Sequence, residues 1–133
     1  MKQALQALEA AALRTIDVFG PQELANTLHA MAKAHCTPTN PLVLEALEQQ
    51  AETLAGTFNE KHVANTLWAY ATMEREPGAG VMRGLEGRAE ALAGTFNEKH
   101  VANTLWAYAT MGREPGEGVM RGWRGGLSRW RAR

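Results

Sequence analysis

The stretch AETLAGTFNEKHVANTLWAYATMEREPGAGVMRGLEGR, residues 51–88, decides the fold because it occurs again, nearly unchanged, as residues 89–126. The two copies differ at six of 38 positions. An older copy, FGPQELANTLHAMAKA at residues 19–34, lies over residues 58–73 at an offset of 39. Repeats of this period are typical of stacked helical units, of which about three are needed for neighbours to bury one another. We predict a repeat domain over residues 1–122, with units at about residues 12–50, 51–88 and 89–122.

Each unit is predicted to hold two helices. The second begins after Asn59 or Asn97 as N-cap, with glutamate in its first turn, and Pro21 takes an early-turn place in the first unit. The helix ends before the Pro-Gly pairs at 77–78 and 115–116, because proline lacks a donor and disfavours helix in the preceding residue. Its apolar residues recur at spacings of three and four and form a stripe: Val63, Ala64, Leu67, Trp68 and Ala71.

The first helix of a unit is predicted over about residues 81–93, with apolar positions Val81, Met82, Leu85, Ala89 and Leu92. Gly80, Gly84 and Gly87 each weaken this helix by about 1 kcal/mol relative to alanine. The fold class that follows is all-α, a solenoid of about three helical hairpins with a repeat of 38–39 residues.

The end of the chain departs from the repeat after Gly122, where GWRGGLSRWRAR replaces the expected GLEGRAEALAGT. Back-translation of the expected segment with a GC-rich choice of codons, followed by deletion of one nucleotide, gives GWRDGLRRWRAR, which matches ten of twelve residues. We therefore predict that residues 123–133 are an irregular basic tail read in a shifted frame, which sequencing the coding DNA would test. Trp123, Trp130 and the arginines 121, 124, 129, 131 and 133 are then weak indicators of a selected function.

Composition bounds the function. The 133 residues carry 14 Lys and Arg against 14 Asp and Glu, so no overall charge attracts nucleic acid or acidic membranes. The single cysteine, Cys36, excludes an internal disulfide and favours a reducing compartment, where we expect a small buried or half-buried thiol. No run approaches the roughly 18 apolar residues of a membrane span, and no secretory signal or transit peptide is recognisable.

Catalysis has little support. Cys36 adjoins His35, but sequence neighbours do not face each other as a nucleophile and a base must. Paired acids, a phosphate-cradling glycine loop and metal-ligand spacing are not evident. We expect no enzyme, no catalytic residue, no metal or other cofactor, no small-molecule substrate and no membrane partner.

The period, the paired helices and the phrase ANTLWAYATMGREPG closely resemble octotricopeptide repeats and the related organellar proteins with FAST-kinase-like and RAP-type regions. The matching elements are ANTL at 25–28, ANTLWA at 64–69 and ANTLWA at 102–107, each followed by a proline turn. The resemblance implies a right-handed α-solenoid that binds single-stranded RNA in a chloroplast or mitochondrion and acts in RNA processing, stability or translation. Known members carry many more repeats, so the resemblance also fits a fragment of a longer protein. Because no targeting peptide is recognisable in the sequence, a cytoplasmic location fits it as well as an organellar one.

Polar side chains at the start of the second helix are the candidate RNA contacts, because a repeat that reads RNA must present amides and charges to a splayed base. They are Asn59, Glu60, Lys61 and His62 in the second unit and Asn97, Glu98, Lys99 and His100 in the third; Gly20, Pro21, Gln22 and Glu23 take these places in the first. The competing interpretation, which ordinary helix caps favour, makes asparagine a cap, glutamate a dipole partner and lysine a solvated charge.

Two further positions of the repeat, one held by asparagine and one by tryptophan, are expected to be structural. Asn26, Asn65 and Asn103 lie within the apolar helix and are predicted to be buried amides with hydrogen-bond partners. Trp68 and Trp106 are predicted to lie in the core rather than to stack on bases. With about three bases engaged at roughly 1–3 kcal/mol each, RNA binding by this chain alone is expected to be weak.

Two other functions fit the same sequence. A helical solenoid can present an extended face to a protein partner, and neutral charge balance suits such a scaffold. Near-identical repeats with a broken end also fit a non-functional fragment of a longer protein. A row of positive charge from Lys33, Lys61, Lys99 and Arg75 would favour RNA, whereas an apolar groove would favour a peptide.

Overall fold

The computed structural model describes residues 2–35 and 40–131, and within these residues the chain is all-α, as predicted, with no strand. The helices are α1 (Lys2–Thr15), η1 (Ile16–Val18), α2 (Pro21–Lys33), α3 (Pro41–Leu54), η2 (Ala55–Thr57), α4 (Glu60–Thr72), α5 (Ala79–Leu92), η3 (Ala93–Thr95), α6 (Glu98–Thr110) and α7 (Glu117–Arg131). None of them combines the length and apolar character needed to cross a membrane. Cys36 lies outside the described residues.

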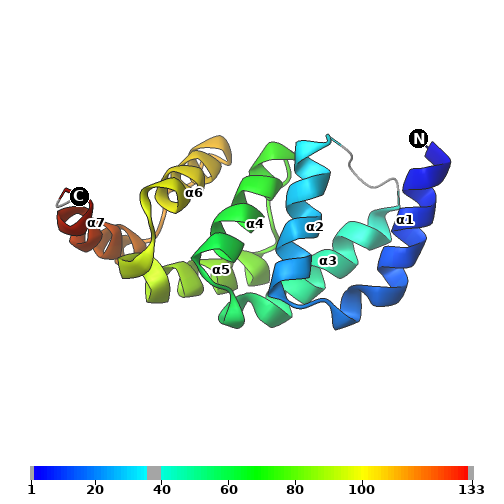
Figure 1. The fold of residues 1–133 in the computed structure, drawn as a ribbon, viewed down its shortest axis with the longest axis horizontal. Coiled ribbons are helices and arrows are strands. Elements are labelled where there is room, and N and C mark those ends of the chain that lie inside the picture. Colours follow the sequence, from blue (N-terminus) through cyan, green and yellow to red (C-terminus); the bar gives the residue numbers. More distant parts are fainter. Residues whose placement is uncertain (1, 36–39, 132–133) are drawn as a thin grey trace.

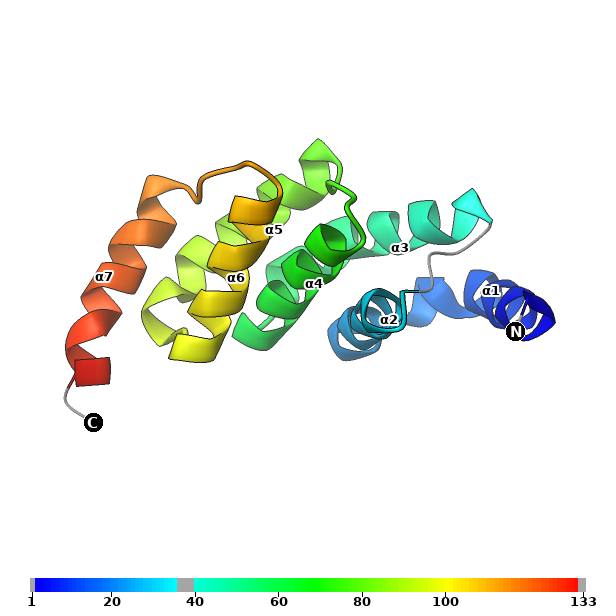
Figure 2. The ribbon, with the colours of Figure 1, turned by 90° about the horizontal axis from the view of Figure 1, so that it is seen from above.

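The helices lie in two layers. Helix α4 packs between α2 and α6, and these three lie side by side (Figures 1 and 2). In the other layer α1 packs against α3, α3 against α5, and α5 against α7. Helices α3, α5 and α7 also contact the short 3-10 helix that follows the preceding helix of this layer, namely η1, η2 and η3. Helices α1 and α7 lie at opposite ends of the molecule (Figure 1).

The starts of α4 and α6 are capped as predicted. The Oδ1 atoms of Asn59 and Asn97 accept hydrogen bonds from the backbone N–H groups three residues later, at 2.9 and 2.8 Å. In α2 the first helical residue is Pro21, and Glu23 accepts a hydrogen bond from the backbone N–H of Gly20 at 2.8 Å. These side chains satisfy donors that a helix start leaves without partners.

The ends of α2, α4 and α6 share one backbone conformation. His35, Glu74 and Gly112 follow at equivalent positions and all have positive φ, 54°, 56° and 70°. After α4, the Arg75 N–H donates to the Tyr70 carbonyl at 3.0 Å, and Arg113 repeats this contact after α6 at 2.9 Å. Such a left-handed residue closes a helix and satisfies its last carbonyls.

The core lies between the layers and follows the predicted stripe. Val63, Ala64, Leu67 and Ala71 of α4 are buried, and so are Val81, Met82, Leu85 and Ala89 of α5. Trp68 is half-buried and packs against this core. The 3.6-residue period therefore predicted which face of each helix turns inward.

Glycine has a role in α5 that the propensity argument missed. A Cβ atom on Gly84 would lie 2.9 Å from the Cβ of Ala55 in η2, too close without a shift. Gly122 in α7 makes the equivalent close approach to Ala93 in η3. Gly84 and Gly122 therefore let each helix pack tightly on the preceding unit, and α5 forms with nearly the predicted bounds despite its glycines.

The prediction of an irregular tail is wrong for residues 123–131, which continue α7 to Arg131. Trp123 takes the position that Leu85 holds in α5, is 4% exposed, and packs against Phe96 with ring centroids 5.7 Å apart. Its indole N–H is buried and has no partner among the described residues. The tryptophan side chain therefore occupies the core position that leucine occupies in α5, and its indole N–H lacks a hydrogen-bond partner there.

Candidate functional site

One face of α2, α4 and α6 carries the same register of side chains in all three helices. Spacings of four and three residues place Lys61, Asn65 and Trp68 on this face of α4, since such residues are neighbours on a helix. The equivalent residues are Lys99, Asn103 and Trp106 in α6, and Gln22, Asn26 and His29 in α2. The face thus runs across three helices that lie side by side.

The aromatic members of this face, His29, Trp68 and Trp106, form a continuous row, here called the aromatic row. The rings of His29 and Trp68 have centroids 4.9 Å apart and are tilted by 36°. Those of Trp68 and Trp106 are 6.3 Å apart and tilted by 34°. Both separations lie within the range of aromatic contact, so each ring is supported by a neighbour from another helix.

The prediction that both tryptophans lie in the core is wrong for Trp106, whose side chain is 47% exposed. Helices α4 and α6 have identical sequences, yet Leu67 is fully buried and Leu105 is 39% exposed. The reason is that α6 covers this face of α4, while no helix of the described chain covers the same face of α6. The exposed end face of α6 consists of Ala102, Leu105, Trp106 and Ala109.

Lysines flank the aromatic row along the helices: Lys61 and Lys99 lie in the first turns of α4 and α6, and Lys33 lies in the last turn of α2. Burial lowers the pKa of His29 below its ordinary value, and the positive charges of Lys33, Lys61 and Lys99 lower it further. All three lysine side chains are exposed. They come from three helices and are three of the four lysines in the chain. Both effects favour the neutral form of the His29 imidazole.

Of the eight candidate RNA contacts at the starts of α4 and α6, the asparagines and histidines have structural roles. Besides the cap, His62 accepts a hydrogen bond at Nδ1 from the Asn59 N–H at 3.1 Å. The imidazoles of His62 and His100 also contact Phe58 and Phe96 edge-on. These polar atoms and rings serve the start of each helix and the core beneath it.

The charged candidates lie at the surface of these helix starts. Glu60 is half-buried, whereas Lys61, Glu98 and Lys99 are exposed. Burial lowers the pKa of His100, which the carboxylate of Glu60 in the neighbouring helix partly opposes. Lys61 and Lys99 are therefore exposed cations, and helix spacing places both on the same face as the aromatic row.

The prediction that the asparagine amides are buried is wrong for Asn26, which is exposed. Asn65 and Asn103 are half-buried, which is less than predicted. Each asparagine lies one turn from an aromatic-row residue on the same helix. Its amide offers both donors and an acceptor to a ligand. The prediction of burial failed because it treated the whole helix as apolar.

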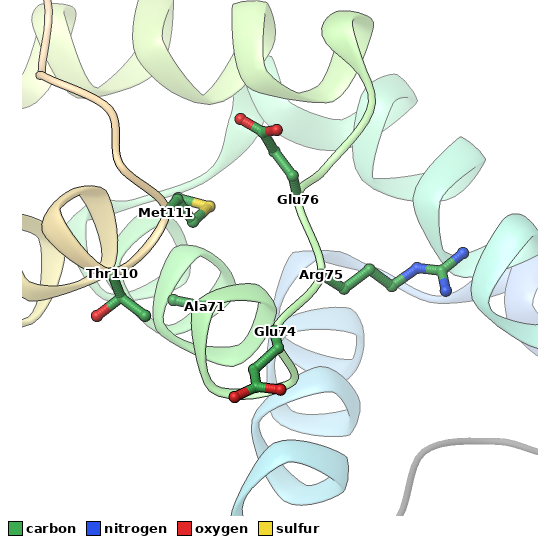
Figure 3. A pocket seen from close by; sticks show the side chains of 6 residues that line it. All are labelled: Ala71, Glu74, Arg75, Glu76, Thr110 and Met111. Carbon is green, nitrogen blue, oxygen red and sulfur yellow. The ribbon is translucent and has the colours of Figure 1, made fainter.

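A shallow hollow of about 280 Å³ lies where α4 and α6 end. Figure 3 shows its lining side chains, Ala71, Glu74, Arg75, Glu76, Thr110 and Met111. Arg75 and Glu74 extend in different directions, and Glu76 forms an ion pair with Arg113. The charged groups do not converge on one point, so the hollow has no built polar site. Arg75 follows the C-terminal end of α4, whereas Lys61 lies in its first turn.

Among the described residues, no three His, Cys, Asp or Glu side chains come together as metal ligands. Comparison of the chain with protein-family models, curated proteins and solved structures finds no match. The shared face of α2, α4 and α6 is therefore the candidate site on geometry and charge alone. The signal for it in the sequence was the common register of His29, Trp68 and Trp106.

Proposed function

We propose that this chain is a right-handed α-solenoid with units of 38–39 residues that binds single-stranded RNA along the shared face of α2, α4 and α6. The observation that carries the proposal is the aromatic row, flanked on the same helix face by the exposed lysines Lys33, Lys61 and Lys99. Proteins that bind single strands combine a positive track for the phosphates with aromatic side chains for the bases. The resemblance to octotricopeptide repeats supports the same ligand and an action on organellar transcripts.

The electrostatics bound the strength of binding. Because the whole chain has no net charge, only a local track can attract phosphate. Three lysine–phosphate contacts on a single strand give a slope of log K against log salt of about −2. Affinity should then fall roughly 20-fold between about 50 and about 200 mM salt.

The test is binding to random single-stranded RNAs of about 12 nucleotides, measured by fluorescence anisotropy at several salt concentrations. The double variant Lys61→Ala/Lys99→Ala should retain about one phosphate contact and bind with a slope of about −0.7. A matched control is Arg83→Ala/Arg121→Ala, which removes the same charge from exposed, equivalent positions of α5 and α7 in the other layer.

The control should bind with the wild-type slope. RNA binding along the shared face is contradicted if the wild type does not bind at the lowest salt. It is also contradicted if both double variants weaken binding equally, because charge anywhere on the surface would then suffice.

A second candidate function, a protein-interaction scaffold, is favoured by the apolar end face of α6, where Leu105 and Trp106 are exposed. Single exposed apolar residues are common, but two adjacent large ones can form the centre of a contact. If the chain is such a scaffold, Leu105→Ala should abolish binding of the protein partner, whereas Lys61→Ala/Lys99→Ala should not.

A further inference from the structure

The indole of Trp106 is the largest aromatic surface of the shared face that remains open. Its side chain is 47% exposed, and its ring contacts Trp68 on the side of α4. In the same row, Trp68 is half-buried and lies between His29 and Trp106. Only the last ring of the row therefore has a large free surface.

The surroundings of this ring are polar and positive on its own helix. Asn103 lies three residues before Trp106 and Lys99 seven residues before, so all three side chains share one helix face. Lys99 is exposed and Asn103 is half-buried. An ammonium group, an amide and an indole in a line match the phosphate, edge and ring of one nucleotide.

We infer that the exposed face of Trp106 is a stacking platform for one unpaired base of the RNA strand, an inference that rests on the RNA binding proposed above. Lys99 binds the adjoining phosphate, and the Asn103 amide faces the edge of the base. Trp68, which His29 contacts on its other side, supports the indole from behind and keeps it in place before RNA binds. The platform requires an unpaired base, because a base inside a duplex has no free face to offer.

The size of the effect is set by base–aromatic stacking. Removing one such contact should weaken binding about 5- to 100-fold. Phenylalanine retains an aromatic face, so Trp106→Phe should lose much less than Trp106→Ala. Leu105→Ala removes an exposed apolar side chain from the same end face, and it should leave RNA affinity unchanged.

The experiment compares the wild type, Trp106→Ala, Trp106→Phe and Leu105→Ala for binding to single-stranded RNA and to its duplex in low salt. Circular dichroism confirms that each variant is folded, which is expected since the side chain is exposed. Indole fluorescence is followed in parallel. Light scattering gives the mass of each protein in solution. The expected result is single-strand preference, a 5- to 100-fold loss in Trp106→Ala, near wild-type affinity in the other variants, and RNA quenching that Trp106→Phe reduces.

The two proposals fail in different ways. If the wild type binds no RNA, both are overturned. If it binds with the expected lysine dependence and Trp106→Ala binds equally well, RNA binding stands and the platform is wrong. Equal losses in Trp106→Ala and Trp106→Phe also overturn stacking. A wild-type dimer that Leu105→Ala and Trp106→Ala both dissociate would show that the end face joins two copies, and would overturn the platform as well.

Discussion

Glu74 and Gly112 end two helices of identical sequence with the same backbone conformation, at φ values of 56° and 70°. Left-handed backbone is unfavourable for glutamate and favourable for glycine. The third unit therefore carries the residue that this turn prefers, and the second does not.

Exchange at these two positions should change stability in opposite directions. Glu74→Gly is expected to raise the free energy of unfolding by about 0.5–1 kcal/mol, and Gly112→Glu to lower it by about 1 kcal/mol. Urea unfolding followed by circular dichroism measures both. Changes of the same sign would contradict the assignment of strain to this turn.

Tight packing of α5 on η2 predicts that two glycines in one helix respond differently to alanine. Gly84→Ala should lower the free energy of unfolding by about 1–3 kcal/mol, since its Cβ would meet Ala55. A Cβ atom on Gly87 meets no atom within 4 Å, so Gly87→Ala should stabilise by up to about 1 kcal/mol through helix propensity. Thermal unfolding of the pair tests the contact, and equal stabilisation by both would refute it.

Docking of α7 depends on Trp123. Trp123→Ala should destabilise the protein by about 3 kcal/mol, because the indole is buried against Phe96. Arg124 is exposed, and Arg124→Ala should stay within about 0.5 kcal/mol of the wild type. Trp123→Leu restores the residue of α5 and removes a buried, unpartnered N–H, so it should lose much less than alanine. If Trp123→Ala lowers the free energy of unfolding no more than Arg124→Ala does, the turn of α7 around Trp123 is not packed against η3 and Phe96.

Stability should fall as the solution becomes acidic. Burial, together with Lys61, lowers the pKa of His62 in the folded chain, against the opposing charges of Glu23 and Glu60. The unfolded chain then binds more protons below pH 6.5, so the contribution is complete above that value and is lost as pH falls through the lower folded pKa. Protonation also removes the Nδ1 acceptor of the Asn59 N–H.

The variant His62→Glu places at this position the residue that α2 has as Glu23, which accepts the same kind of bond. Urea midpoints between pH 7.5 and 5.5 should fall less steeply in this variant than in the wild type. The pKa values of His29 and His100 are also lowered by burial, so part of the wild-type slope should persist. An unchanged slope would exclude His62 as a contributor.

The repeat predicted the helices, their caps and the inward face, because these depend on local spacing and on chemistry within each unit. It could not predict the exposure of Trp106. The 13 residues of α4 and α6 are identical, so Trp68 and Trp106 differ only in whether another helix of the described chain packs on that side of their own helix. The close approach of Gly84 to Ala55 was hidden for a similar reason, since it depends on another unit.

The candidate site could be derived from the sequence only in part. Lys61 and Lys99 were among the residues chosen from the sequence, and they lie on the shared face. The asparagines and histidines chosen with them take part in helix capping and ring packing. The aromatic row joins side chains from three units, and a helix-by-helix assessment of burial could not reveal it.

The most direct measurement is photo-crosslinking of a 4-thiouridine single-stranded RNA to the wild-type chain, with the crosslinked peptides identified by mass spectrometry. RNA binding along the shared face predicts crosslinks in peptides of α2, α4 and α6, with Trp106 among the modified residues and excess salt suppressing them. Crosslinks confined to α3, α5 or α7, or none that unlabelled RNA can displace, would contradict it.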